Sequence, residues 1–81
     1  MGQDCWKIPP ALVQMYGTKV KFLDLSFNCL TTLRGVEKFS NLEELVLDNN
    51  KLSDIIFLPY LPNLQILSLN KNNVSHVKCV L

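Results

Sequence analysis

Apolar and polar positions recur along this chain at a fixed interval. Asparagines stand at 28, 50 and 72, so that each is 22 residues from the next. Sets of apolar residues share the interval: 20, 42 and 64; 23, 45 and 67; 25, 47 and 69; 30, 52 and 74; 33, 55 and 77; and 36, 58 and 80. A constant period of this length indicates a repeated structural unit whose neighbours stack on one another.

The pattern of residues within each unit predicts a short strand followed by a turn. The Leu-x-Leu pattern places two leucines on one face of the strand, so three strands would stack as a parallel sheet with these leucines inward. Asn28, Asn50 and Asn72 would bond backbone groups left unpaired by the turns and form a ladder. The later apolar positions predict a return along the opposite side in short 3₁₀ or extended segments, because 22 residues leave no room for a long helix.

The N-terminal stretch has a different pattern. Pro9 and Pro10 followed by Gly17 are typical of a helix start and a helix end. Leu12, Met15 and Tyr16 are predicted to lie on one face of this helix and to cover the open end of the first repeat. Terminal units of stacked repeats usually carry such modified caps.

The predicted fold class is therefore α/β: a solenoid forming a right-handed β-α superhelix, with the short parallel sheet on its concave face. The expected organisation is a tail and capping helix over 1–19 and three repeats over 20–41, 42–63 and 64–81. No polar cap follows Val80 in the chain. We expect either that a partner covers the apolar flank of this last repeat, with self-association as one form of such cover, or that the chain is a shortened form of a longer protein.

The strand face is the candidate binding surface. The positions expected to point outward from the strands are Phe22, Asp24, Glu44, Val46, Asp48, Ile66, Ser68 and Asn70. Exposed apolar groups beside carboxylates are typical anchors for a protein partner. The alternative surface is the segment 56–60 on the convex side, which contains Ile56, Phe57 and Tyr60.

Charge and cysteine content narrow the expected partners and the expected location. The net charge is +1 and the two signs are interspersed, which argues against a partner recruited by charge, such as nucleic acid or a membrane. Cys5, Cys29 and Cys79 are far apart and form no Cys-x-x-Cys motif, so three free thiols are expected. With no predicted signal peptide, this favours an intracellular location, cytoplasmic with the nucleus left open.

The sequence predicts neither an enzyme nor a cofactor. His76 is the only histidine, and no phosphate loop, zinc spacing or nucleophile elbow accompanies it. A metal site is not expected either, because Asp48-Asn49-Asn50 lacks the glycine and the closing glutamate of a calcium loop.

The entries to the repeats, "FSNLEEL" and "LPNLQIL", resemble the intracellular 22-residue subtype of leucine-rich repeats. The order of "IPPALVQMYG", "FLDLSFNCL" and "LPNLQILSLNKN" resembles the family of leucine-rich melanocyte differentiation-associated proteins. That resemblance implies a protein-binding adaptor linked to melanocyte differentiation, melanosome formation and vesicle trafficking, with a small GTPase or a trafficking complex as partner. Three alternatives stay open: a phosphatase-regulator-like subunit, a ribonucleoprotein scaffold subunit, and a truncated isoform with no independent role.

Overall fold

The computed structural model describes residues 5–79. Its elements are α1 (Pro10–Tyr16), β1 (Phe22–Asp24), the 3₁₀ helix η1 (Val36–Lys38), β2 (Glu44–Val46), β3 (Ser53–Leu58), β4 (Ile66–Ser68) and β5 (Asn73–Cys79). The expected core position Val80 and the outer ends of the first and last expected segments lie outside the described residues.

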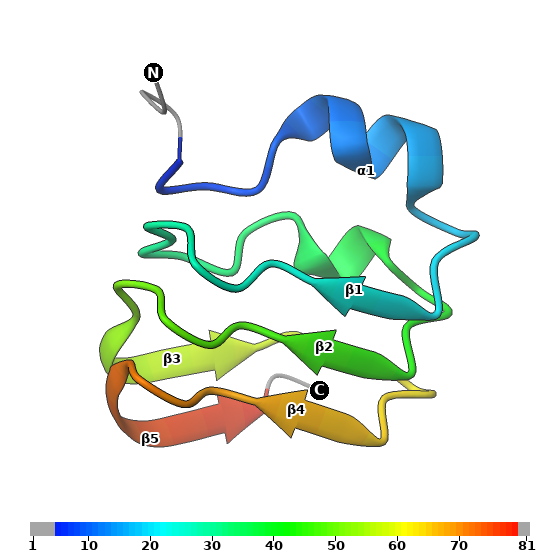
Figure 1. The fold of residues 1–81 in the computed structure, drawn as a ribbon. Coiled ribbons are helices and arrows are strands. Elements are labelled where there is room, and N and C mark those ends of the chain that lie inside the picture. Colours follow the sequence, from blue (N-terminus) through cyan, green and yellow to red (C-terminus); the bar gives the residue numbers. More distant parts are fainter. Residues whose placement is uncertain (1–4, 80–81) are drawn as a thin grey trace.

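Parallel strands form two sheets on opposite sides of the molecule, with α1 above them (Figure 1). One sheet has the order β1-β2-β4, and the other pairs β3 with β5. Leu23 is in register with Leu45, and Leu45 with Leu67, so the 22-residue period is the register of the first sheet. The chain is therefore α/β with parallel strands, as predicted. The extended and 3₁₀ return segments are also confirmed, but the pairing of β3 with β5 was not foreseen.

The hydrophobic core fills the space between these two sides. The side chains with the least exposure are Val36, Phe39, Leu42, Leu45, Leu47 and Leu52. Burial of this apolar surface is the main stabilising contribution to folding. None of the helices within residues 5–79 is long and apolar enough to cross a membrane.

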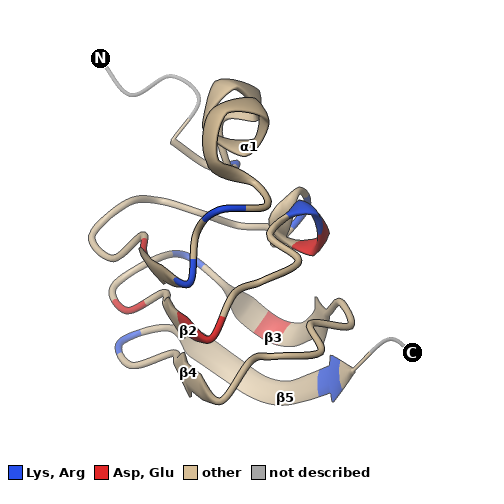
Figure 2. Cartoon of the chain, turned by 90° about the vertical axis from the view of Figure 1, so that its right-hand side faces the viewer, with Lys and Arg blue, Asp and Glu red and all other residues tan. Residues whose placement is uncertain are grey.

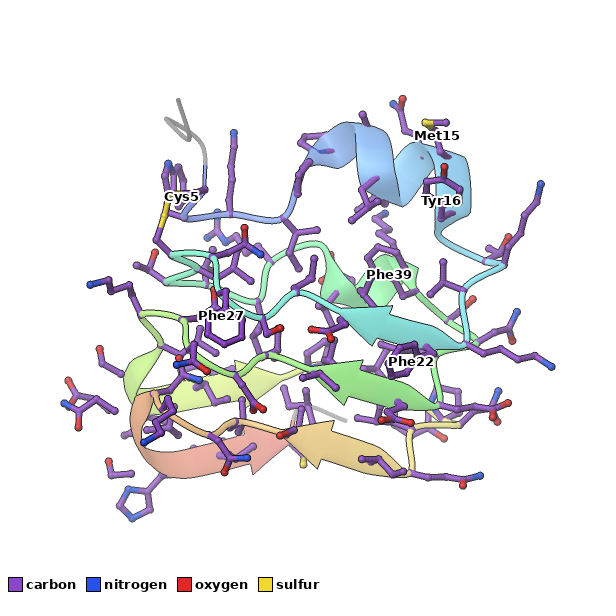
Figure 3. All side chains as sticks on the ribbon, viewed as in Figure 1. Cys5, Met15, Tyr16, Phe22, Phe27 and Phe39 are labelled. Atoms are coloured by element: carbon purple, nitrogen blue, oxygen red, sulfur yellow. A yellow bond between two sulfur atoms is a disulfide. The ribbon has the colours of Figure 1, made fainter. Side chains whose placement is uncertain are left out.

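Helix α1 contacts the core through a face that is shifted from the predicted one. Leu12 and Val13 are partly buried against the core, whereas Met15 and Tyr16 are exposed. Figure 3 shows Met15 on the side of the helix away from Phe39. Successive helix residues are rotated by about 100°, so a contact face centred between Leu12 and Val13 leaves Met15 about 110° away. Tyr16 lies on the same side as Leu12 but is the last residue of the helix, and it is 44% exposed. The predicted contact is therefore right for Leu12, wrong for Met15, and wrong in burial for Tyr16.

The apolar residues at positions 33, 55 and 77 are not equally buried: Leu33 belongs to the core, whereas Ile55 and Val77 are exposed. Ile55 is 45% exposed, whereas Ile56 is 6% exposed and belongs to the core. The pairing of β3 with β5 shifts between Asp54 and Ile55, so that Ile55 faces His76 and Ile56 faces Val77. Asp54 has a left-handed φ of 57° at this irregularity. Because side chains alternate along a strand, a shift of one residue exchanges the buried and exposed positions.

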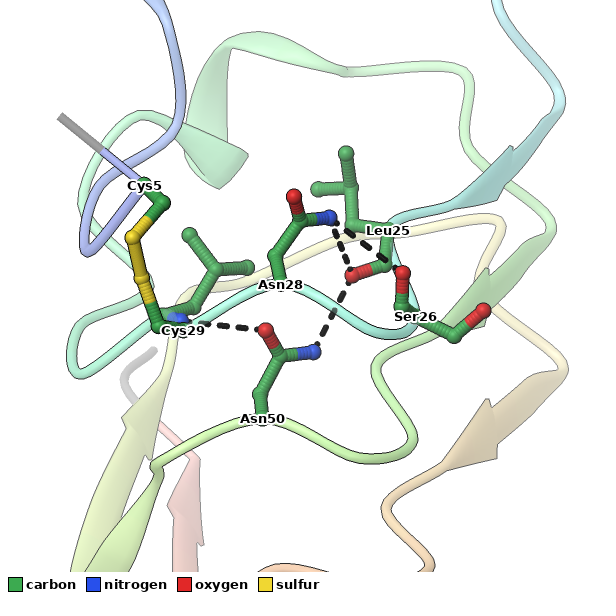
Figure 4. Close-up of a disulfide and its surroundings, with 7 residues drawn as sticks. Cys5, Leu25, Ser26, Asn28, Cys29 and Asn50 are labelled. Carbon is green, nitrogen blue, oxygen red and sulfur yellow. Dashed lines mark hydrogen bonds between the residues drawn. A yellow bond between two sulfur atoms is a disulfide. The ribbon is translucent and has the colours of Figure 1, made fainter. Parts of the chain in front are cut away.

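The cysteines also differ from the prediction. Cys5 and Cys29 form a disulfide, with Cα atoms 5.3 Å apart, while Cys79 is free and exposed. The N-terminal segment runs beside the first repeat, since the Thr31 N–H donates to the Trp6 carbonyl at 3.0 Å. This packing brings together two cysteines 24 residues apart, which their spacing alone does not reveal (Figure 4). The expectation of three free thiols is wrong.

Candidate protein-interaction surface

The strand face is built by the sheet β1-β2-β4, whose alternation turns one set of side chains outward. Leu23 and Leu45 are buried beneath this sheet. Their neighbours Phe22 and Glu44 point to the opposite side, as alternate residues of a strand do. Because the strands are parallel and in register, the repeat period places equivalent residues in rows across the sheet.

The first row combines two apolar side chains with a carboxylate. Phe22 pairs with Glu44, and Glu44 pairs with Ile66. Phe22 is 57% exposed and Ile66 is 52% exposed, while Glu44 between them is half-buried. Neighbouring strands lie about 4.8 Å apart, so the two apolar residues are about 10 Å apart at the backbone. A partner could insert one apolar group between them and meet Glu44.

The second row contains Asp24, Val46 and Ser68 in register. Asp24 Oδ1 accepts hydrogen bonds from the Ser26 hydroxyl at 2.6 Å and from the Ser26 N–H at 2.9 Å. These two bonds, with the hydroxyl contributing most, lower the pKa of the exposed Asp24 carboxyl. The carboxylate is held in one orientation next to the half-buried Val46.

Asp48 and Asn70 lie beyond the strands, where the chain begins to turn. Asp48 Oδ1 accepts from the Ser68 hydroxyl at 2.6 Å and from the Asn70 N–H at 2.8 Å. Asp48 therefore joins the second repeat to the third. We interpret it as a residue that orders the edge of the strand face, with less freedom to reorient towards a partner than Glu44.

Asparagines fix the turns that follow the strands. Asn50 Nδ2 donates to the carbonyls of Leu47 at 2.9 Å and Leu25 at 3.0 Å, and Asn72 Nδ2 donates to Leu47 at 2.8 Å and Leu69 at 3.2 Å. Asn28 bonds only within its own repeat, to the carbonyls of Leu25 and Ser26 (Figure 4). The strands are thus held in register by side chains as well as by their own backbone bonds.

Phe27 is a surface residue that the sequence analysis missed. It is 78% exposed and has a left-handed φ of 59°. Asn49 and Lys71 occupy the equivalent positions with φ of 57° and 60°. A bulky side chain rarely adopts this conformation, whereas asparagine does so more readily. Figure 3 shows Phe22 at the start of β1 and Phe27 in the turn that follows this strand. The signal in the sequence is that a phenylalanine precedes Asn28 where the other two repeats have Asn49 and Lys71.

In the alternative surface on the convex side, Ile56 is buried, while Phe57 and Tyr60 are exposed.

Charged residues of both signs are scattered over the chain rather than gathered on one side (Figure 2). Among residues 5–79, His, Cys, Asp and Glu side chains form no group of three that could hold a metal ion. His76 lies on β5 with its side chain exposed. The strand face, by contrast, offers exposed side chains on strands that are paired in register.

Comparison with known proteins gives matches that cover most of the repeats. A family model described as "Leucine Rich repeats (2 copies)" matches residues 18–60. The leucine-rich melanocyte differentiation-associated protein of Homo sapiens is 45% identical over 64 residues, which make up 75% of this chain and 32% of that protein. No solved structure matches the chain significantly.

A plant protein is similar over a comparable stretch. The protein named "Protein phosphatase 1 regulatory inhibitor subunit PPP1R7 homolog" of Arabidopsis thaliana is 41% identical over 58 residues, which are 70% of this chain and 18% of that protein. The chain thus spans about a third or less of the length of the curated relatives it matches.

Proposed function

Because this chain belongs to the leucine-rich repeat family, we propose that it is a non-enzymatic module that binds a protein partner through its strand face. The observation that carries this proposal is the row Phe22, Glu44 and Ile66, in which two exposed apolar side chains flank a carboxylate. Apolar anchors on rigid strands bind a partner at low cost in conformational entropy.

The cellular role that we propose is an adaptor in melanocyte differentiation, including melanosome formation and vesicle trafficking. The name of the human relative supports a link to melanocyte differentiation. The family resemblance of the repeats supports a small GTPase or a trafficking complex as the partner. An intracellular location, in the cytoplasm or the nucleus, rests on the same resemblance alone. The disulfide of Cys5 and Cys29 counts against it, because such bonds persist mainly in oxidising compartments.

A second candidate is a regulatory subunit of a phosphatase. It is favoured by the 41% identity to a relative named as a regulatory inhibitor subunit of protein phosphatase 1. Both candidates are protein-binding functions, so they share the strand face as the site and differ only in the partner.

The finer architecture that we propose is a solenoid with α1 as its N-terminal cap. The packing of Leu12 and Val13 against the core of the first repeat supports this assignment. A cap would keep the apolar flank of the first repeat from water, which repeat proteins generally require for solubility.

The test is direct binding by purified proteins. The chain is measured against a panel of small GTPases in both nucleotide states and against the catalytic subunit of protein phosphatase 1. The variant Phe22→Ser/Ile66→Ser should lose binding to whichever protein binds. A matched control, Phe57→Ser/Tyr60→Ser, removes two exposed apolar side chains from outside the strand face and should leave that binding unchanged.

Circular dichroism establishes that both double variants are folded. Unchanged binding by the Phe22→Ser/Ile66→Ser variant, together with lost binding by the control, would transfer the site to the convex segment and overturn the proposal.

A further inference from the structure

A groove lies outside the strand face, between the N-terminal segment and the segment that leads into η1. Its volume is ≈ 690 Å³. Trp6, Ile8 and Val13 supply apolar lining, and Thr32 and Gly35 contribute from the opposite side. No part of the sheet β1-β2-β4 lines it, so the function proposed above does not use it.

The charged side chains that line this groove are all basic. They are Lys7, Arg34 and Lys38, and the described lining residues include no aspartate or glutamate. The nearest carboxylate on η1, that of Glu37, accepts a hydrogen bond from the Gly35 N–H at 3.1 Å. Arg34 and Lys38 are exposed and Lys7 is half-buried. Three cations around an apolar floor attract an anionic ligand that also carries an apolar group.

The groove is held open by contacts in the folded chain. The Lys7 ammonium lies 5.5 Å from the centre of the Trp6 ring, within the range of a cation–π contact. The Trp6 carbonyl accepts from Thr31, and the adjacent Cys5 is bonded to Cys29. Ile8, two residues after Trp6, is buried in the core. A wall anchored on both sides of Trp6 loses little conformational entropy when a ligand binds.

We propose that this groove binds a short acidic peptide segment, with an apolar side chain of the peptide against Trp6 and its carboxylates near Lys7, Arg34 and Lys38. A peptide fits these observations better than nucleic acid or a membrane. The cations surround one hollow instead of forming a long stripe that could follow a phosphate backbone. The apolar floor is recessed, so it cannot insert into a lipid bilayer. A side chain of a peptide can enter the groove and contact this floor.

Peptide selection tests the chemistry of the ligand. A library of random short peptides is selected on the folded chain, and peptides that also bind the variant Arg34→Glu/Lys38→Glu are discarded. The expected consensus has Asp or Glu flanking an aromatic or aliphatic residue. A consensus without acidic residues, or failure to enrich any peptide, would overturn the proposal.

The fluorescence of Trp6 then reports where the selected peptide binds. Trp6 is the only tryptophan in the chain, so the emission reports on the surroundings of this one side chain in the wall of the groove. The consensus peptide should change the emission. Two analogues should fail to do so: one with Asn and Gln in place of Asp and Glu, and one with Ser in place of the apolar residue.

Charge removal distinguishes local contacts from a general effect of net charge. Arg34→Gln and Lys38→Gln should each weaken binding about threefold or more, because each removes one ion pair at a partly exposed site. The control Lys51→Gln/Lys71→Gln removes two cations from a different surface and should change binding by less than about twofold, since distant charges are screened. Equal effects of both sets would count against the groove.

Vesicles containing phosphatidylserine form the last arm of the experiment. If these vesicles change the Trp6 emission and the selected peptides do not, the ligand is an anionic membrane surface and the peptide proposal is wrong. Binding by the peptide and not by vesicles supports it. None of these outcomes bears on the strand face, which is tested by Phe22→Ser/Ile66→Ser.

Discussion

The Asn50 side chain donates a hydrogen bond to the carbonyl of Leu25, one strand away, at 3.0 Å. Its Oδ1 accepts from the Leu30 N–H at 3.0 Å, so one amide satisfies a donor and an acceptor of the preceding repeat. Asn50 is only 7% exposed. A buried side chain that bonds two turns at once adds a link between the repeats to the backbone pairing of their three-residue strands.

Replacement of this amide should therefore be costly. Asn50→Leu should lower the free energy of unfolding by about 1–3 kcal/mol, because the buried groups of Leu25 and Leu30 lose a partner. Chemical denaturation measures the change. The matched control is Asn28→Leu, since Asn28 is exposed and bonds only within its own repeat. An equal loss in both variants would show that the link between repeats is not the cause.

The disulfide should be detectable and stabilising. Alkylation of the folded protein without reductant should label Cys79 alone, and mass spectrometry should find Cys5 linked to Cys29. Cys5→Ser/Cys29→Ser should lower the free energy of unfolding by about 3 kcal/mol, as expected for a loop closed over this separation. Cys79→Ser serves as the control and should leave stability unchanged. Labelling of all three cysteines in the untreated protein would exclude the bond.

The left-handed backbone conformation at position 27 should cost more free energy with phenylalanine than with asparagine. Phe27→Asn should raise the free energy of unfolding by about 1 kcal/mol, because asparagine adopts a left-handed φ with less strain. Little packing is lost, since Phe27 is 78% exposed. Thermal unfolding should show an increase of several degrees. The reverse change at the equivalent position, Asn49→Phe, should destabilise. A decrease with Phe27→Asn would mean that the ring makes stabilising contacts.

Asp24 should titrate below the ordinary carboxyl pKa of 3.8, because Ser26 donates to it from its hydroxyl and its N–H. A pKa depressed by folding stabilises the native state at pH above this ordinary value. That contribution disappears as the pH falls through the pKa of the folded protein. NMR titration of the Asp24 carboxyl carbon measures it.

The Ser26→Ala variant should raise the Asp24 pKa toward 3.8, because it removes the hydroxyl that contributes most to the shift. Ser68→Ala should not, because the Ser68 hydroxyl bonds Asp48. An Asp24 pKa that is the same in Ser26→Ala as in the unmodified chain would refute this cause.

The period in the sequence predicts the first sheet well, because the register of β1, β2 and β4 follows the same 22-residue interval as the leucines. It also led to the expectation that the asparagines bond backbone groups, and they do so in the structure. The repeated pattern therefore predicts the part of each repeat from Leu-x-Leu to the asparagine, because equivalent residues of neighbouring repeats stack on one another.

Sequence periodicity fails where tertiary contacts decide. The irregular pairing at Asp54 makes Ile56 the core residue, and no local pattern separates it from Ile55. The disulfide depends on how the N-terminal segment lies beside the first repeat. The outward positions of the strand face follow from the alternation of side chains along a strand. The identity of the partner that the row Phe22, Glu44 and Ile66 would bind does not follow from the sequence of this chain.

The pairing of β3 with β5 has a consequence for the shape that the strand face presents. Hydrogen-bonded strands keep a separation of about 4.8 Å, and here they do so on both sides of the second and third repeats. Layers of equal thickness at both edges favour stacking with little curvature. The first repeat instead carries the 3₁₀ helix η1 on its outer side, where it has no strand paired with β3. We therefore expect curvature mainly at the junction of the first and second repeats, so that a partner reaching from Glu44 to Ile66 meets a flatter surface than one extending to Phe22.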